Sequence, residues 1–365
     1  MKNLQMKLGD RSYPIDISSG GLAELGNRLK EILPESRKIL IATDKNVNKI
    51  YSSDVENVLA DSGFSVEIKV VEPGEKSKSI EIASAFYDFM LNKKFERSSV
   101  VVGLGGGVVG DLAGFVASTY MRGIKFVQVP TSLLAQVDSS IGGKVAVNHP
   151  EAKNVIGAFY QPEYVMIDVG TLKTLPAREF KGGLAEIIKH GYGFDSAFFE
   201  FLSENKNAIK NKEEKPLKEM IYRSCLIKKK VVQRDERETG ERAKLNLGHT
   251  VAHALEATGE FSGLNHGEAV AVGMVAESIL AEKEGLINRR NRDELIDLLK
   301  SYSLPISIPK EIDISSLIDA MSKDKKIYHG RVNFSLPAGT GQTKIYRNWS
   351  KENLVDALEK TKKID

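Results

Sequence analysis

The sequence predicts an N-terminal α/β domain with a Rossmann-like parallel sheet, followed by a mostly α-helical C-terminal domain. In the first half, short β-branched apolar runs alternate with segments of helical periodicity, which is typical of a parallel sheet covered on both faces. After about Thr171 helical segments dominate and strand signals become sparse. We therefore place the boundary near Leu175-Pro176, which gives domains 1–175 and 176–365.

The strands expected in the first domain are short and almost continuously apolar, as buried parallel strands are. They cover residues 38–43, 65–71, 98–104, 125–129 and 164–168. Two helices are expected between them. One spans residues 80–92, where apolar side chains recur at helical spacing, and the other follows a glycine-rich loop after residue 104.

The second domain is expected to be built from helices with few strands. The helical segments are 184–190, 215–232, 250–258, 268–284 and 289–301, and the strand signals are 331–335 and 344–346. The lysine-rich stretch 206–218 is interpreted as a solvated face or loop.

Composition excludes several classes of protein. Of the 365 residues, 41% are hydrophobic and 28% charged, as in ordinary soluble domains. A net charge of +3 argues against nucleic-acid binding by bulk electrostatics. The single cysteine, Cys225, excludes an intrachain disulfide and a cysteine-cluster metal site. No apolar run is long enough for a signal peptide or a membrane span, so we expect a cytoplasmic protein without membrane or nucleic-acid partners.

A glycine-rich loop follows the third expected strand. Gly105, Gly107 and Gly110 satisfy the pattern G-x-G-x-x-G between a strand and a helix, where backbone amides can meet a pyrophosphate. The alternative is a tight turn of an α/β domain. The usual acidic residue about 20 positions later is missing, since position 130 is a proline. Asp44, at the end of an earlier strand, is the carboxylate expected to reach the ribose.

Histidines cluster in the second domain. His249 and His253 are four residues apart, so both project from one face of a helix, and His266 follows closely. Together with a carboxylate from elsewhere they suggest a divalent-metal site. Spacing alone favours His249 with His253 as ligands, and the alternative is two unrelated surface histidines.

The segment between Pro130 and Pro162 carries charged residues among small and apolar ones. Asp138, Lys144, Lys153 and Asn154 stand near the pair Gly142-Gly143. Lysines beside paired glycines suit a phosphate or carboxylate ligand, because backbone and ammonium donors can both approach it.

The motifs together resemble 3-dehydroquinate synthase, a family of the sugar phosphate cyclases. They are G-G-G-V-V-G-D-L-A-G-F, P-T-S-L-L-A-Q-V-D-S-S-I-G-G-K, I-G-A-F-Y-Q-P, G-L-A-E-I-I-K-H-G, L-N-L-G-H-T-V-A-H-A-L-E and N-H-G-E-A-V, in the family's order. The resemblance implies an enzyme with its active site in the cleft between the two domains.

The resemblance also implies roles for individual residues. The metal ligands are Glu186, His249 and His266, with zinc expected and cobalt as the alternative, and His253 faces the substrate instead. Glu238 is the expected proton acceptor, and His253, Lys189 and Asp138 are further catalytic residues. The implied NAD-binding residues are Asp44, Glu75, Lys78, Gly105, Gly106, Gly107, Val108, Asp111, Thr131, Ser132, Asp138, Lys153 and Thr174. The implied substrate-binding residues are Arg122, Asp138, Lys144, Asn154, Lys189, Lys228, Arg242, Asn246, His253 and Lys325 or Lys326. Arg122 serves the neighbouring subunit's site in a homodimer.

The reaction implied by the resemblance converts 3-deoxy-D-arabino-heptulosonate 7-phosphate to 3-dehydroquinate and phosphate in the shikimate pathway. A hydride passes from C5 to NAD+ and back, so NAD is unchanged overall. One alternative is a metal-dependent polyol or polyol-phosphate dehydrogenase. A second is a cyclase that makes valiolone- or inosose-type rings from substrates without a carboxylate, and a third is a binding protein that has lost turnover. Lys228, Arg242 and Asn246 argue against the first two.

Overall fold

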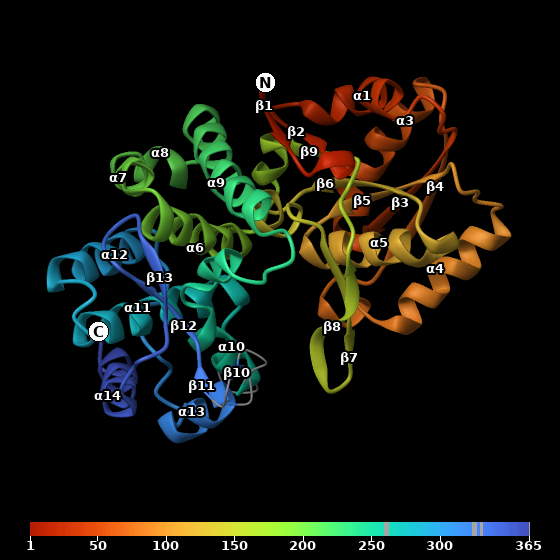
Figure 1. The fold of residues 1–365 in the computed structure, drawn as a ribbon. Helices are drawn as coiled ribbons and strands as arrows, with labels where there is room; N and C mark the ends of the chain where they lie inside the picture. Colours follow the sequence, from red (N-terminus) through yellow and green to blue (C-terminus); the bar gives the residue numbers. More distant parts are fainter. Residues whose placement is uncertain (259–262, 323–326, 329–330, 365) are drawn as a thin grey trace. The chain divides into compact units, whose positions relative to one another are not determined.

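The computed structural model describes residues 1–258, 263–322, 327–328 and 331–364 and folds as two compact units, Met1–Leu175 and Pro176–Asp365 (Figure 1). The first unit is a sheet with helices on it and the second is mostly helical, so the predicted fold class is confirmed. Of the helices within the described ranges, none combines the length and apolar character needed to cross a bilayer.

The first unit is organised by one seven-stranded sheet with the order β1-β2-β9-β6-β5-β3-β4. β1 pairs antiparallel with β2, and every other neighbouring pair is parallel. The strands are β1 Lys2–Met6, β2 Tyr13–Ser18, β3 Lys38–Asp44, β4 Ser65–Val71, β5 Val100–Gly105, β6 Lys125–Pro130 and β9 Tyr164–Asp168. The first two strands were not among the predicted ones.

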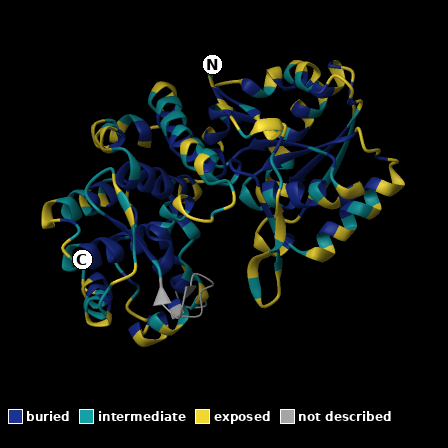
Figure 2. Ribbon diagram, viewed as in Figure 1, coloured by how far each residue is buried: buried dark blue, intermediate teal, exposed yellow. Residues whose placement is uncertain are grey.

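Helices cover both faces of this sheet, as the apolar strands require. Along β3 alternate side chains point to opposite faces, so that Ile39 and Ile41 join one core and Leu40 and Ala42 the other. The first core is closed by α1 (Leu25–Ile32) and α3 (Ser53–Asp61). The second is closed by α4 (Ile80–Asn92) and α5 (Gly107–Thr119), and both cores are dark blue in Figure 2.

The polar segment after β6 forms a two-stranded antiparallel hairpin of β7 (Lys144–His149) and β8 (Ala152–Phe159). The sequence pattern did not predict these strands, because most β8 side chains are exposed or half-buried and the apolar alternation is weak. The hairpin contacts α5, where a Cβ atom on Gly114 would lie 2.3 Å from a Val145 methyl group.

The described residues of the second unit form mostly helices, together with two short two-stranded sheets, β10–β11 and β12–β13. The helices are α6 Ala177–Phe194, α7 Ser196–Glu204, α8 Lys206–Lys210, α9 Glu214–Arg234, α10 His249–Ala257, α11 His266–Lys283, α12 Arg289–Ser301, α13 Ile314–Ser322 and α14 Lys351–Lys362. The strands are β10 Ile327–Tyr328, β11 Arg331–Val332, β12 Phe334–Pro337 and β13 Thr343–Tyr346. The lysine-rich stretch after residue 206 is largely helical, forming α8 and the start of α9, with most of its side chains at the surface.

Helix α11 is the central helix of this unit. Nearly every residue from Gly267 to Ala281 is buried, as expected of a helix that is apolar on all sides (Figure 2). It contacts α6, α10, α12 and α14. Residues near its N-terminus are therefore held against α6 and α10.

Candidate active site

Two glycines of α11 allow close contacts between helices of the second unit. A Cβ atom on Gly267 would lie 2.0 Å from the carbonyl oxygen of Gly182 in α6. A Cβ atom on Gly273 would lie 2.0 Å from the carbonyl oxygen of Gly248, which caps α10. Because neither position has room for a side chain, the backbones of three helices meet directly.

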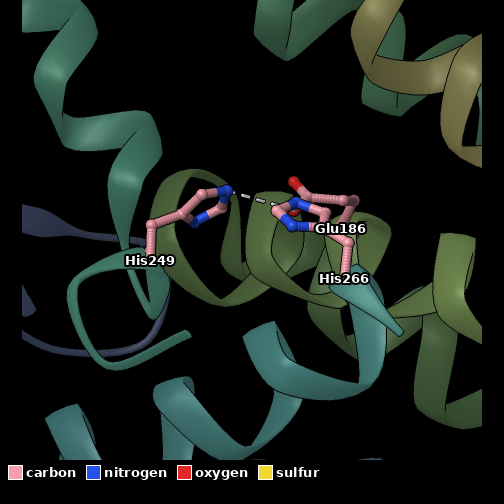
Figure 3. A group of neighbouring side chains, drawn as sticks. All are labelled: Glu186, His249 and His266. Atoms are coloured by element: carbon pink, nitrogen blue, oxygen red, sulfur yellow. Dashed lines mark ion pairs between the residues drawn. The ribbon is translucent and has the colours of Figure 1, made fainter. Parts of the chain in front are cut away.

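These contacts bring three chemically active side chains together. Glu186 lies on α6, His249 begins α10 and His266 begins α11, as Figure 3 shows. The Nε2 atom of His249 is 3.4 Å from Glu186 Oε1, and His266 Nε2 is 3.6 Å from the same oxygen. One ligand atom from each residue lies within 4.8 Å of the others. Carboxylate and imidazole donors at this spacing could hold a divalent metal ion.

The chemistry of the donors fits a cation. Glu186 is fully buried, and neither of its carboxylate oxygens accepts a hydrogen bond from the described residues. Burial by itself would raise the pKa of Glu186, but the Lys189 ammonium and the two imidazoles hold that pKa well below its usual range. Burial and the Lys189 charge lower the pKa of His249 well below its ordinary value, so its imidazole is neutral, as ligation requires.

His266 is supported from its other side. Its Nδ1 atom lies 3.5 Å from the Glu256 carboxylate. Burial would lower the pKa of His266, but Glu186 and Glu256 outweigh it and raise that pKa to about 10. A carboxylate behind a ligating histidine fixes the ring and makes it a better donor. Sequence reasoning missed Glu256, although its i+7 spacing from His249 places both on one helix face.

His253 stands beside this group. Its ring centroid is 5.6 Å from that of His249 and 6.5 Å from that of His266. The grouped ligand atoms come from Glu186, His249 and His266, whereas the helical spacing had favoured His253 with His249. His249 and His253 are four residues apart, so both rings project from one face of α10. The Glu186 carboxylate, however, faces His249.

Among the described residues of the second unit, three lysine or arginine side chains are buried: Lys189 on α6, Lys228 on α9 and Arg242 in the turn before α10. Lys189 pairs with Glu186, and a guanidinium N–H of Arg242 donates to the Glu236 carbonyl. Asn246 Nδ2 donates to Glu238 Oε1 at 2.9 Å. These cations lie in the same unit as the Glu186–His249–His266 cluster.

In the first unit, Asp44 and the glycine loop lie at the carboxyl edge of the sheet. Ala42 of β3 pairs with Gly103 of β5, and two residues further these strands end at Asp44 and Gly105. The chain turns outward from β3 to β4 and then crosses back to β5, so a topological switch point falls between these strands. Ligands of open α/β sheets bind at such points.

The glycine loop has the backbone geometry of an anion site. Gly106 caps α5 without a side chain, so the first amides of the helix have no side-chain cap. A Cβ atom would lie 2.7 Å from Val109 at Gly105 and 3.1 Å from Ser139 at Gly107. The loop thus fits a dinucleotide phosphate. The Asp44 carboxylate accepts hydrogen bonds from Asn46 N–H and Val47 N–H, at 2.8 and 3.1 Å.

A buried lysine connects the predicted cofactor and substrate residues of this unit. The Lys78 ammonium donates to Asp111 Oδ2 and to Asn154 Oδ1. Asn148 extends the network, since its side chain donates to Glu75 at 2.7 Å and accepts from Asn154 N–H at 2.9 Å. Asn148 was not predicted from the sequence.

The remaining predicted residues of the first unit are spread over its loops and hairpin. Thr131 N–H donates to Gly105 O at 2.9 Å, and Ser132 follows it beside Gly106. Thr174 Oγ1 lies 2.6 Å from the Tyr51 hydroxyl. Val108 lies in the first turn of α5, Asp138 in the turn Ala135–Ser139, and Lys144 and Lys153 in the hairpin. Arg122, with φ 68°, ends the short turn Tyr120–Arg122 that follows α5. Lys325 and Lys326 lie outside the described residues.

The two units together define a metal-site enzyme with a dinucleotide-type loop. Residues 68–182 match the family model 3-dehydroquinate synthase N-terminal, and residues 183–327 match 3-dehydroquinate synthase C-terminal. The chain therefore belongs to the 3-dehydroquinate synthase family. The 3-dehydroquinate synthase of Desulforamulus reducens is 46% identical over 358 residues, covering 98% of this chain and 99% of that protein. The one from Pelotomaculum thermopropionicum is 45% identical over 98% of this chain and 96% of its own length.

Solved structures share the fold. The 2-epi-5-epi-valiolone synthase ValA of Streptomyces hygroscopicus, with NAD+ and Zn2+ bound, is 27% identical with a TM-score of 0.88 over 97% of this chain and 98% of ValA. A 2-deoxy-scyllo-inosose synthase is similar in fold, at 24% identity and a TM-score of 0.90 over 99% of this chain and 100% of that one. An iron-containing alcohol dehydrogenase of Thermococcus thioreducens, at 14% identity, has a TM-score of 0.71 over 97% of this chain and 99% of that one. Fold alone does not separate cyclase from dehydrogenase, whereas the sequence relatives do.

Proposed function

We propose that this chain converts 3-deoxy-D-arabino-heptulosonate 7-phosphate to 3-dehydroquinate and phosphate, using NAD+ catalytically and one divalent metal. The observation that carries the proposal is the Glu186–His249–His266 cluster, which lies in the same unit as the buried cations Lys189, Lys228 and Arg242. The substrate is a sugar acid that carries a carboxylate, a phosphate and a diol, so its site needs a metal for the diol and cationic partners for the two anionic groups. The family membership supports the same reaction.

Glu186, His249 and His266 would hold the metal, with Zn2+ as the proposed ion and Co2+ as the alternative. ValA, a solved relative at 27% identity, has Zn2+ and NAD+ bound. The residues that would hold NAD+ are the glycine loop 105–108, Asp44, Glu75, Lys78, Asp111, Thr131, Ser132, Asp138, Lys153 and Thr174. When bound, the metal supplies a Lewis acid and NAD+ a reversible hydride acceptor.

The protein's own part is positioning and proton transfer. Arg242, with Asn246 and Lys228, would bind the carboxylate and ring hydroxyls. The phosphate would be bound by Lys144, Asn154 and His253, together with either Lys325 or Lys326. Glu238 would accept a proton, with Lys189, His253 and Asp138 as the further catalytic residues. We also propose a cytoplasmic homodimer in which Arg122 serves the neighbouring subunit, which light scattering on the purified protein tests.

The decisive assay supplies the heptulosonate phosphate with Zn2+ and with NAD+ far below the substrate concentration. Phosphate release and formation of the cyclic product should continue well beyond one equivalent of NAD+. Product that stops at one equivalent, with NADH accumulating, would instead identify a dehydrogenase. Glu186→Ala should abolish turnover and bound metal together.

A further inference from the structure

We propose that Asp235 is a positioning residue that holds residues 235–242 so that Glu238 and Arg242 are presented to the substrate. The proposal rests on the proposed function for the roles of those two residues. Asp235 carries no role in the sequence analysis, and it lies directly after the last residue of α9.

The carboxylate of Asp235 accepts hydrogen bonds from three residues of the segment 235–242: Thr239, Gly240 and Arg242. Its Oδ1 atom accepts hydrogen bonds from the backbone N–H of Thr239 at 2.9 Å and from the Thr239 hydroxyl at 3.1 Å. Its Oδ2 atom accepts from Gly240 N–H at 2.8 Å and from Arg242 N–H at 2.9 Å. One side chain therefore closes the turn from both ends.

This carboxylate is anchored and ionised. The Asp235 N–H donates to Val231 O at 3.1 Å, which ties the segment to the last turn of α9. Burial would raise the pKa of Asp235, but the N–H groups of Arg242, Thr239 and Gly240 outweigh it and keep that pKa below its usual value. Hydrogen bonds to an ionised acceptor are stronger than neutral ones, so the turn is firmly held.

The segment 235–242 needs stabilising hydrogen bonds because one of its residues has an unfavourable backbone conformation. Glu238 has φ 57°, in the left-handed region that non-glycine residues rarely adopt. Its side chain is oriented by Asn246, whose Nδ2 donates to Glu238 Oε1 at 2.9 Å. Arg242, four residues further, is bound through its own N–H to Asp235 and through its guanidinium to Glu236 O. Loss of the Asp235 acceptors would let the two side chains move independently.

The experiment compares Asp235→Ala and Asp235→Asn with the matched control Asp313→Ala. Asp313 also accepts a backbone N–H and a hydroxyl, from Ser316 at 2.9 and 3.1 Å, but it stabilises the start of α13. In Asp235→Ala we expect kcat to fall about 10- to 100-fold, as small misplacements of reacting groups do, with an increased KM and unchanged bound Zn2+. Asp235→Asn keeps one oxygen acceptor and should lose less. The control should alter thermal stability only.

Two further measurements separate positioning from stability. Limited trypsin digestion followed by mass spectrometry should show faster cleavage after the exposed Arg237 in Asp235→Ala than in Asp313→Ala. In a double-mutant cycle with Glu238→Gln, the two losses in kcat should not multiply, because Asp235 acts through Glu238.

Unchanged cleavage together with unchanged kcat and KM would overturn the proposal, and so would losses that multiply fully in the double variant. If the wild-type enzyme fails to turn over the heptulosonate phosphate, the proposed function fails. The digestion, which needs no substrate, still decides whether Asp235 holds the segment.

Discussion

The Oε2 atom of Glu277 accepts a hydrogen bond from the backbone N–H of Gly248 at 2.6 Å. Glu277 is fully buried in the middle of α11, and Gly248 has φ 81°, immediately before His249. His249 Nδ1 in turn lies 3.1 Å from Leu247 O. A carboxylate of the central helix therefore holds the turn that directs His249 Nε2 towards Glu186.

We expect Glu277→Ala to weaken Zn2+ binding about 10- to 100-fold, the usual effect of losing a group that orients a metal ligand. Competition with a chromophoric chelator measures it. Glu277→Gln keeps an acceptor of the same shape and should retain most of the affinity. Glu284→Gln is the matched control, since Glu284 also accepts a backbone N–H, from Ser350 at 3.0 Å, but at the other end of α11. Equal affinity in Glu277→Ala and the control would contradict the expectation.

Gly267→Ala should both destabilise the protein and damage the metal site. The added methyl group would lie 2.0 Å from Gly182 O, so α6 and α11 must separate. We expect a loss of about 1–3 kcal/mol in the free energy of unfolding, as for other overpacked contacts. Denaturant unfolding and metal analysis check this. Gly106→Ala, in extended backbone where the nearest atom to the added methyl group is 3.4 Å away, should leave stability and metal content nearly unchanged.

Alanine variants of the histidines should separate metal ligands from a substrate residue. We expect His249→Ala and His266→Ala to lose bound metal, because each removes a donor that faces Glu186. His253→Ala should keep its metal and lose activity. Elemental analysis after dialysis gives the answer. If His253→Ala were as metal-free as His249→Ala, the proposed ligand set would be wrong.

Arg242→Ala should reduce kcat/KM at least about tenfold. A charge-assisted hydrogen bond contributes about 1.5–3 kcal/mol, and 1.4 kcal/mol is about a factor of ten. Arg242→Lys should restore activity only in part, because lysine lacks the planar fork of donors. An inhibitor series with and without the carboxylate tests the assignment. The affinity loss should be confined to ligands that carry it, and an equal loss for both would make Arg242 structural.

Glu284 should make stability depend on acidic pH. Its carboxylate accepts hydrogen bonds from Ser350 N–H, Asn353 Nδ2 and the Tyr346 hydroxyl. Burial would raise the pKa of Glu284, but these donors lower it below the usual value. Its contribution is therefore complete above the unfolded pKa of about 4.3 and is lost as pH falls through the lower folded pKa. The stability difference between wild type and Glu284→Gln, measured by denaturant unfolding, should shrink in that range. A difference that grows in acid would contradict this.

The local hydrophobic pattern was sufficient to predict the ends of an element where the segment has the same environment along its whole length. β4, α4, β9 and α12 begin and end where the periodicity predicted, because each is either apolar throughout or apolar on one regular face. α6 is longer than predicted, since Gly182 and Gly183 interrupt the apolar pattern although tertiary contacts keep them helical. β1 and β2 lack a continuous apolar run, and they become strands by pairing at the sheet edge.

The sequence by itself determined the alternation of strands and helices, the glycine loop after β5 and the family to which the chain belongs, because these depend on residue order alone. The spacing of the histidines did not determine which of them lie beside Glu186. Spacing on one helix selects His249 and His253, and the family resemblance implied His266 in place of His253. The close approaches of Gly267 to Gly182 and of Gly273 to Gly248 are what place His266 opposite His249. Asp235, Glu256 and Glu277 gained their importance in the same way. Each contacts a site residue through folding of the chain, and only packing between helices and turns decides such contacts.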